Sequence, residues 1–307
     1  RAMVTMKQVG LNVAADPLMS LAYVGVKGGM VIVSADDPGP ISSQTEQDTR
    51  RFADFCRIPV FDPSSPEEAY KMIGEAFEYS EKYNTPVLFR PTTRVCHAYA
   101  SIDNCDSPSP KKYEGFVKDS KKWVIFPRLS FANHIMIEKR NVEIGKDFST
   151  YSANKAEGVN SEKAVVTSGI SYAYTKECLK DYPDVKLIKI ATAYPFPEDF
   201  VLSSLEGAKE VLCIEELSPF IEEQILKLTG KHGLQLKVSG KLDGKVQAGG
   251  ENSTDKIAAI LGDFLGKDFT ADGYDLSDAP ALPVRPPVLC AGCPHRASFY
   301  AVKQAMK

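Results

Sequence analysis

Two cysteines and a histidine near the carboxyl end of the chain have the spacing that most directly suggests chemistry. The segment reads Leu289-Cys-Ala-Gly-Cys-Pro-His-Arg, with two thiols three positions apart and a histidine, His295, two positions further on. This pattern can ligate a metal ion or an iron–sulfur cluster. A closed site needs four ligands, however, and the chain contains no second Cys-x-x-Cys pair. Cys290 and Cys293 therefore do not predict a zinc centre formed by this chain alone.

A second group of polar side chains follows an apolar run in the first part of the chain. The run Gly29-Met-Val-Ile-Val-Ser is typical of a strand buried on both faces. The loop after it offers, within nine residues, Ser42, Ser43, Gln44, Glu46, Gln47, Asp48 and Arg50. Because ligands of parallel α/β sheets bind at the carboxyl ends of the strands, this loop is a candidate for binding a polar cofactor or a partner domain. The alternative is a solvated loop that only caps the next helix.

A third candidate lies where the first strand gives way to a helix. Lys7 ends an apolar run, and Gly10-Leu-Asn12 then opens a helical stretch. A cation beside a helix start could hold an anion there. The alternative is a surface lysine beside a tight turn.

Composition narrows the class of protein. Of the 307 residues, 43% are hydrophobic and 25% charged, with a net charge of −3. Without a basic tract, an apolar run of membrane-spanning length or a signal-peptide layout, we expect a cytoplasmic protein with neither nucleic acid nor membrane as partner. Seven scattered cysteines argue against a disulfide scaffold. The motifs of Rossmann dehydrogenases, P-loop hydrolases and α/β-hydrolases are absent. His134 and His232 have no pattern that predicts ligation.

The elements that would position these residues alternate between strands and helices. Ser65-Pro-Glu-Glu predicts a helix start, with serine as N-cap and proline at the first helical position, and the helix should run to about residue 83. A second α/β unit begins with the strand Ala164-Val-Val-Thr-Ser. Between the units, residues 101–160 are polar and proline-containing and predict a surface connector with one helix at about 130–143. The fold class is α/β, with two parallel, doubly wound sheets.

Four motifs, taken in order, resemble one family. They are Met6-Lys-Gln-Val-Gly-Leu-Asn-Val-Ala-Ala-Asp-Pro-Leu, Gly25-Val-Lys-Gly-Gly-Met, Asp36-Asp-Pro-Gly with the following Ser-Ser-Gln-Thr-Glu-Gln-Asp, and Cys290-Ala-Gly-Cys-Pro-His-Arg. They are similar to the large (alpha) subunits of indolepyruvate ferredoxin oxidoreductases, within the thiamine-diphosphate-dependent 2-oxoacid:ferredoxin oxidoreductases. The chain also starts on a strand and stops on a helix, so we expect an internal fragment of such a protein.

The resemblance implies a domain layout. Residues 1–104 would be the later part of the domain that binds the thiamine pyrimidine, and 105–160 a connector. Residues 161–275 would form a domain like the carboxyl-terminal domain of transketolase. Residues 276–307 would be a proline-rich linker and the start of the diphosphate-binding domain.

The resemblance also implies a function. The family decarboxylates aromatic 2-oxoacids such as indolepyruvate oxidatively to acyl-CoA, using thiamine diphosphate, Mg²⁺ and iron–sulfur clusters, with a small (beta) subunit, coenzyme A and ferredoxin as partners. Most of the cofactor-binding residues would lie outside this chain, which alone should be inactive. The alternatives are a pyruvate or branched-chain 2-oxoacid oxidoreductase and a non-catalytic assembly subunit.

Matched to the family's motifs, the candidate residues take expected roles. His295 would lie near the cofactor as the catalytic residue. Lys7, Asn12, Ser42, Ser43 and Gln44 would line the cofactor site. Cys290 and Cys293 would ligate a cluster, with the remaining ligands beyond residue 307.

Overall fold

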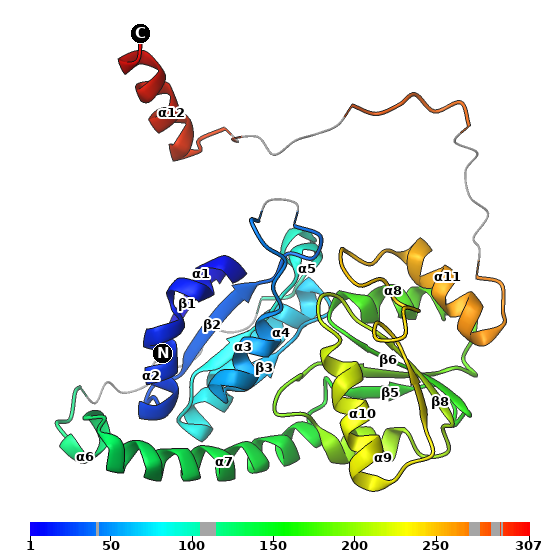
Figure 1. The fold of residues 1–307 in the computed structure, drawn as a ribbon, viewed down its shortest axis with the longest axis horizontal. Coiled ribbons are helices and arrows are strands. Elements are labelled where there is room, and N and C mark those ends of the chain that lie inside the picture. The colour runs from blue at the N-terminus through cyan, green and yellow to red at the C-terminus, as the bar shows by residue number, and fades with distance from the viewer. Residues whose placement is uncertain (41–42, 105–114, 270–276, 284–288, 290) are drawn as a thin grey trace. The chain divides into compact units, whose positions relative to one another are not determined.

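The computed structural model of the chain describes residues 1–40, 43–104, 115–269, 277–283, 289 and 291–307. It contains two units, residues 1–270 and 271–307. Within the described residues the first unit holds two sheets (Figure 1). The second unit has one helix, α12 (Pro294–Ala305), preceded by a turn.

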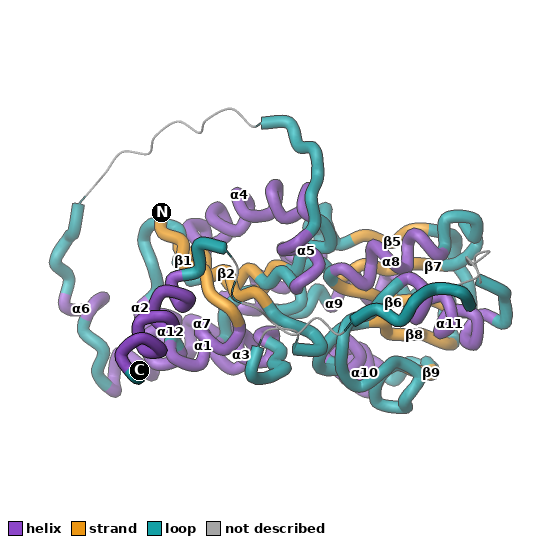
Figure 2. Tube along the Cα trace, turned by 90° about the horizontal axis from the view of Figure 1, so that it is seen from above, coloured by secondary structure: helices purple, strands orange, loops and turns teal. Residues whose placement is uncertain are grey.

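The first sheet is parallel and doubly wound. Its strands are β1 (Ala2–Lys7), β2 (Met30–Ala35), β3 (Val60–Phe61) and β4 (Val87–Phe89), in the order β1-β2-β4-β3. Figure 2 shows α4 (Pro66–Tyr83) on one face and α2 (Ala15–Val24) and α3 (Thr49–Cys56) on the other. The second half of α7 (Pro127–Ser149) packs with the α4 side through Ile144 and Phe148. Two short helices, α1 (Gln8–Val13) and α5 (Thr93–His97), follow β1 and β4. The predicted parallel sheet is confirmed.

The second sheet is parallel except at one edge. Its strands are β5 (Lys155–Glu157), β6 (Lys163–Ser168), β7 (Lys186–Ile190), β8 (Glu210–Ile214) and β9 (Lys237–Ser239), in the order β5-β7-β6-β8-β9, and β5 alone is antiparallel. The helices of this part are α8 (Ile170–Cys178), α9 (Glu198–Ser204), α10 (Phe220–His232) and α11 (Thr254–Leu265). Alternate residues of β6 and β8 pack to opposite faces: Val165 and Leu212 join α8 and α11, whereas Val166 and Cys213 join α9 and α10.

Local sequence explains the predicted helix start at Ser65. Its hydroxyl accepts a hydrogen bond from the Glu68 backbone N–H at 3.2 Å, and Pro66 occupies the first helical position. The helix ends at Tyr83, where Asn84 adopts a left-handed conformation with φ 50°. Both predicted ends of this helix are confirmed.

The region predicted as a connector is more ordered than its composition suggests. The predicted helix at 130–143 is present, but α7 extends it to Pro127–Ser149, and the short α6 (Ser120–Trp123) precedes it. Ile144 and Phe148 of α7 are fully buried and pack with Phe61 of the first sheet. The last part of the region forms β5. The domain bounds inferred from the sequence stay a prediction.

The two sheets share one hydrophobic core. Ile32 and Leu88 of the first sheet belong to the same buried cluster as Val166 and Ile188 of the second. The backbone joins them as well, because Val60 N–H donates to the Tyr194 carbonyl at 2.7 Å and Asp62 N–H to the Ala191 carbonyl at 2.8 Å. In the described part of the chain, no helix is long and apolar enough to cross a membrane.

Candidate functional site

The carboxyl ends of the first sheet's strands bring together residues that lie far apart in the sequence. Lys7 ends β1 and pairs in register with Ala35, the last residue of β2. Asp36 and Asp37 follow β2 directly, and Thr93 comes shortly after β4. Since these strands are parallel, all of these residues lie at one edge of the sheet, where ligands of such folds bind.

Asp37 holds the candidate residues of this edge together. Its Oδ2 accepts hydrogen bonds from Lys7 Nζ at 3.1 Å and from Ser43 Oγ at 2.6 Å. Its Oδ1 accepts one from Thr93 Oγ1 at 2.9 Å. The Asp37 side chain is 4% exposed, whereas that of Lys7 is 40% exposed. The lysine therefore carries a charge that Asp37 orients and that a ligand can still reach.

The loop after β2 is held through three consecutive residues, Thr45, Glu46 and Gln47. Gln8 Nε2 donates to the Thr45 carbonyl at 2.9 Å, and Asn12 Nδ2 donates to Gln47 Oε1 at 3.1 Å. On the other side, the Gly250 N–H donates to Glu46 Oε1 at 2.8 Å. The loop is thus held between α1 and a glycine-containing loop of the second sheet.

Glycine is required where these two loops meet. Gly39 has φ 59°, and a Cβ added there would lie 3.0 Å from the Cα of Gly250. Both the left-handed backbone conformation and the close approach of Gly250 would strain any other residue at this position.

A buried cluster of charged side chains lies beneath the loop, with Arg90 at its centre on the first sheet. Arg90 Nε lies 2.7 Å from Asp36 Oδ2, and Arg90 Nη1 lies 3.1 Å from Asp62 Oδ2. These three side chains are at most 2% exposed. Asp36 Oδ2 also accepts the Thr49 N–H at 3.0 Å, so the pair fixes the start of α3.

Arg50 extends the same cluster into the second sheet. Its guanidinium pairs with Asp48 at 2.6 Å and with Glu215, which follows β8, at 2.8 Å. It also donates to Ser168 Oγ, at the end of β6, at 3.2 Å and to the Glu216 carbonyl at 3.0 Å. The carboxyl ends of both sheets are therefore tied by one buried side chain.

Burial raises the carboxyl pKa values of this cluster, and the neighbouring arginines lower them. Burial raises the pKa of Asp36 to about 6, although Arg90 opposes the shift. Burial likewise raises the pKa of Glu216 to about 7 against the hydrogen bond it accepts from the Asn252 N–H. For Asp48 burial acts in the same sense, but Arg50 and Arg90 outweigh it and lower its pKa to about 2. The fold therefore favours the protonated form of Asp36 and Glu216, and burial raises the pKa values of Asp62 and Glu215 in the same direction.

The structure brings some of the predicted site residues together. Lys7 and Ser43 meet through Asp37, and Asn12 contacts the same loop through Gln47. Gln44 is exposed. Ser42 lies outside the described residues, so its predicted role stays a prediction.

The cysteine and histidine residues of the last motif lie in the second unit. Cys290 is outside the described residues. Cys293 Sγ lies 3.5 Å from His295 Nδ1 at the start of α12. Within the described ranges, no group of three or more His, Cys, Asp or Glu side chains could hold a metal ion.

Sequence reasoning missed Asp37 and Thr93. Asp37 stands in one of the four motifs that resemble the family but is not among the candidate site residues, and Thr93 stands in none of these motifs. The available signal was position: both come within four residues of the end of an apolar strand, where the edge of a parallel sheet gathers polar side chains.

Solved structures define the fold class. The chain is similar to a 2-oxoglutarate:ferredoxin oxidoreductase from Magnetococcus marinus, with a TM-score of 0.61 and 14% identity, over 85% of this chain and 52% of that one. It is also similar to a split-gene transketolase, with a TM-score of 0.52 and 12% identity, over 86% and 75% of the two chains. No protein-family model matches the chain. The fold is that of the α/β domains these two enzymes share.

The sequence relatives share one name. The chain is 38% identical over 309 residues to the indolepyruvate oxidoreductase subunit IorA of Methanothermobacter thermautotrophicus and 38% identical over 319 residues to that of Thermococcus kodakarensis. Each match covers 99% of this chain and 49% of the relative. Along nearly its whole length the chain is similar to these indolepyruvate oxidoreductase subunits, and it spans about half of their length.

Proposed function

We propose that this chain is part of a thiamine-diphosphate-dependent enzyme that oxidatively decarboxylates aryl pyruvates, indolepyruvate among them, to acyl-CoA. The observation that carries the proposal is the similarity to IorA proteins along 99% of the chain. The enzyme would assemble from this large subunit together with a small one, take coenzyme A as acyl acceptor and pass electrons through iron–sulfur clusters to ferredoxin. Cys293, together with Cys290, would contribute ligands to such a cluster.

The residues at the edge of the first sheet fit one wall of a cofactor site. When bound, thiamine diphosphate supplies the electron sink for decarboxylation. Lys7 offers a half-exposed cation to an anionic group, and Ser43 and Thr93 offer hydroxyls beside it. The buried Thr92 hydroxyl at the same edge has no hydrogen-bond partner within the described residues. Asp37 orients Lys7 and Ser43, which this chain would use to bind and position the ligand.

The described residues supply only part of such a site. They contain no cluster that would hold Mg²⁺. By the resemblance, the carboxylate that activates thiamine and the metal loop lie in other parts of the longer protein. The chain alone should therefore bind the cofactor poorly and have no activity.

Titration of the 307-residue chain with thiamine diphosphate and Mg²⁺ tests this division. We expect no saturable heat at micromolar concentrations, because Lys7 and the neighbouring hydroxyls provide only one side of the site. The complete large subunit with its small partner should bind under the same conditions. Micromolar binding to the chain alone would contradict the placement of the missing groups.

The complete enzyme allows a test of His295. A hydrogen bond from His295 to a charged group is worth roughly 1.5 to 3 kcal/mol, which corresponds to about a ten- to hundred-fold change in rate. We expect His295→Ala to lower kcat/KM for indolepyruvate by that factor without changing the melting temperature. His232→Ala, at the exposed end of α10, should change it less than about two-fold and is a cleaner control than His134, which stacks on Tyr23. If His295→Ala and His232→Ala changed kcat/KM equally, His295 would not be part of the active site.

The substrate is tested by the same assay with a panel of 2-oxoacids. Indolepyruvate and phenylpyruvate should be preferred over pyruvate and branched-chain 2-oxoacids. A higher kcat/KM for pyruvate than for indolepyruvate would contradict the proposed substrate class. No turnover with any of these 2-oxoacids would favour a non-catalytic assembly role.

A further inference from the structure

One loop of the second sheet reaches across to the segment that carries Ser43. This loop, residues 246–252, lies in the connection from β9 to α11, and we call it the supporting loop. Its Gly250 N–H donates to Glu46 Oε1 at 2.8 Å. Gly39 also approaches it so closely that an added Cβ would lie 3.0 Å from the Gly250 Cα. The supporting loop therefore touches the segment after β2 on both sides of Ser43 in the sequence.

The supporting loop is also paired with α5 of the first sheet. Glu251 Oε2 accepts hydrogen bonds from Arg94 Nη2 at 2.6 Å and from Arg94 Nε at 3.1 Å. The neighbouring residue, Thr93, donates its hydroxyl to Asp37 at 2.9 Å. Two segments that meet at Asp37, the one after β2 and the start of α5, are thus both in contact with the supporting loop.

The supporting loop is itself fixed by the second sheet and its helices. Asn252 is 3% exposed, its N–H donates to Glu216 Oε1 at 2.9 Å, and its Nδ2 donates to Ser171 Oγ at 2.9 Å. Within the loop, Gln247 Nε2 donates to the Glu251 carbonyl at 2.7 Å. A support whose own polar groups are paired can hold a neighbouring segment in one place.

The segment after β2 has little structure of its own. Its described residues between 38 and 48 form no helix or strand. From one side α1 holds it, through the Thr45 carbonyl and the Gln47 side chain. From the other side it is held through Glu46, which is exposed and accepts the Gly250 N–H. A hydrogen bond to an ionised acceptor is about twice as strong as one between neutral groups, so this contact is a main tie on that side.

We propose that Glu46 is a positioning residue for the site at this edge. Its bond to the supporting loop would keep the segment in the conformation in which Ser43 donates to Asp37. Glu46 would act through the segment and not by touching the ligand. This role rests on the proposed function, in which Ser43 and Lys7 bind the cofactor. The fraction of molecules in the competent conformation then sets the apparent affinity of the site.

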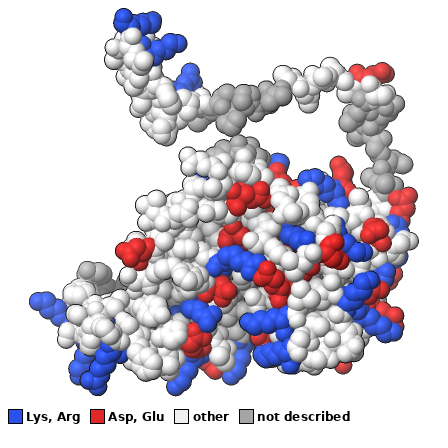
Figure 3. All heavy atoms as spheres, viewed as in Figure 1, with Lys and Arg blue, Asp and Glu red and all other residues white. Residues whose placement is uncertain are grey.

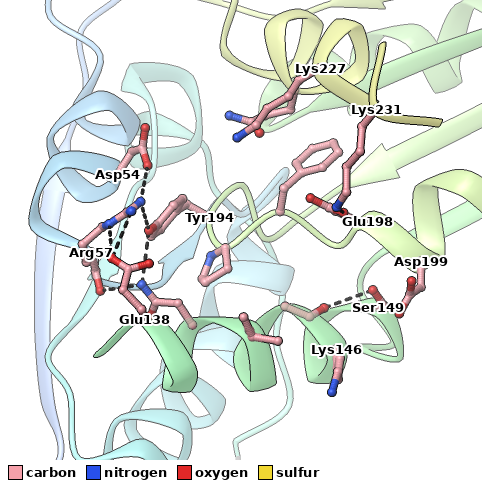
Figure 4. A pocket seen from close by; sticks show the side chains of 16 residues that line it. Asp54, Arg57, Glu138, Lys146, Ser149, Tyr194, Glu198, Asp199, Lys227 and Lys231 are labelled. Atoms are coloured by element: carbon pink, nitrogen blue, oxygen red, sulfur yellow. Dashed lines mark hydrogen bonds and ion pairs between the residues drawn. The ribbon is translucent and has the colours of Figure 1, made fainter. Parts of the chain in front are cut away.

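A glutamate elsewhere in the first unit provides a matched control. It lines a hollow of about 500 Å³ between α3, α7, α9 and α10, where Glu198 pairs with Lys231 at 2.6 Å (Figure 4). The lining of this hollow shares no residue with the candidate site. Figure 3 shows basic and acidic side chains intermixed on one face of the molecule, and exposed ion pairs on such a surface contribute little. Glu198→Ala therefore removes the same charge without touching the supporting loop.

The affinity of the complete enzyme for thiamine diphosphate tests the role of Glu46. Glu46→Ala should raise the dissociation constant about five- to ten-fold, because alanine cannot accept the Gly250 N–H. Glu46→Gln keeps an acceptor oxygen at the same reach and should stay within about three-fold of the parent. Glu198→Ala should change the constant less than about two-fold. Calorimetric titration in saturating Mg²⁺ measures all four proteins. Equal constants for Glu46→Ala and the parent, or equal losses in the alanine and glutamine variants, would overturn the positioning role.

Amide hydrogen exchange on the same proteins separates this role from the proposed function. In Glu46→Ala, peptides that cover residues 43–48 should exchange faster than in the parent, while peptides that cover β2 should keep the parental rate. This measurement needs no ligand. Unchanged exchange at 43–48 would show that the supporting loop does not hold the segment. Faster exchange with an unchanged affinity for thiamine diphosphate would show that the segment is held but that this edge does not bind the cofactor, which would overturn the proposed cofactor site.

Discussion

Arg90→Met is expected to lower the free energy of unfolding by about 3 to 5 kcal/mol. The change removes a guanidinium that pairs with Asp36 at 2.7 Å and Asp62 at 3.1 Å, in a place where all three side chains are at most 2% exposed. Two carboxylates would then remain buried without their cation. Denaturation in urea at pH 7, followed by circular dichroism, measures the change.

Arg94 provides the matched control. Its guanidinium pairs with Glu251 at 2.6 Å, but its side chain is 53% exposed, and ion pairs of this kind contribute about 0 to 1 kcal/mol. Arg94→Met should therefore cost no more than about 1 kcal/mol. If Arg90→Met and Arg94→Met had equal effects, Arg90 would not be the centre of a buried cluster.

The stability of the chain should fall as the pH rises from about 4.5 to above 7, and Glu216 should be a main cause. Burial raises its pKa from 4.5 to about 7, which means that the folded state favours the protonated carboxyl. The stability gained in this way is fully present below the unfolded pKa and is lost as the pH rises through about 7. A shift of this size corresponds to about 3 kcal/mol. Asp36 contributes in the same sense, with a pKa raised to about 6.

Glu216→Gln tests the cause, because the amide keeps the shape of the protonated carboxyl and cannot ionise. Unfolding free energies between pH 5 and 8 should then vary less with pH, and the variant should be more stable than the parent at pH 8. Asp48, with its pKa lowered to about 2, acts in the opposite direction and only at lower pH. Glu177→Gln, at an exposed ion pair on α8, is the control and should retain the parental slope. An unchanged slope in Glu216→Gln would show that Glu216 ionises freely in the fold.

The elements that the sequence predicts correctly are those defined by short-range signals. The apolar runs that contain β2 and β6 are buried strands because neighbouring helices cover both faces, and continuous Val and Ile residues fit such strands. The start of α4 follows from Ser65 and Pro66 alone. By contrast, β5 reads Lys-Ala-Glu and forms only because β7 offers an edge to pair with, which no local pattern reveals.

The contacts of the candidate site depend on residues far apart in the sequence. Lys7 and Ser43 could be proposed from motifs, but no motif indicates that Asp37 joins them. Arg50 reaches Ser168, which is 118 residues away, and Glu216 lies further still. Composition and periodicity carry no information on such pairs, because they arise only when the edges of two sheets face each other.

The shared core has a consequence for how the first unit can evolve and unfold. Its two sheets look like separate modules in topology, yet Ile32, Leu88, Val166 and Ile188 belong to one buried cluster and Arg50 spans both edges. Opening either sheet alone would expose apolar surface and charged groups of the other at the same time. We therefore expect the backbone amides of β2 and β6 to exchange with solvent at a common slow rate, through one cooperative event. A recombinant protein that kept only one of these sheets would therefore carry apolar surface without the residues that cover it and buried charges without the groups that pair with them.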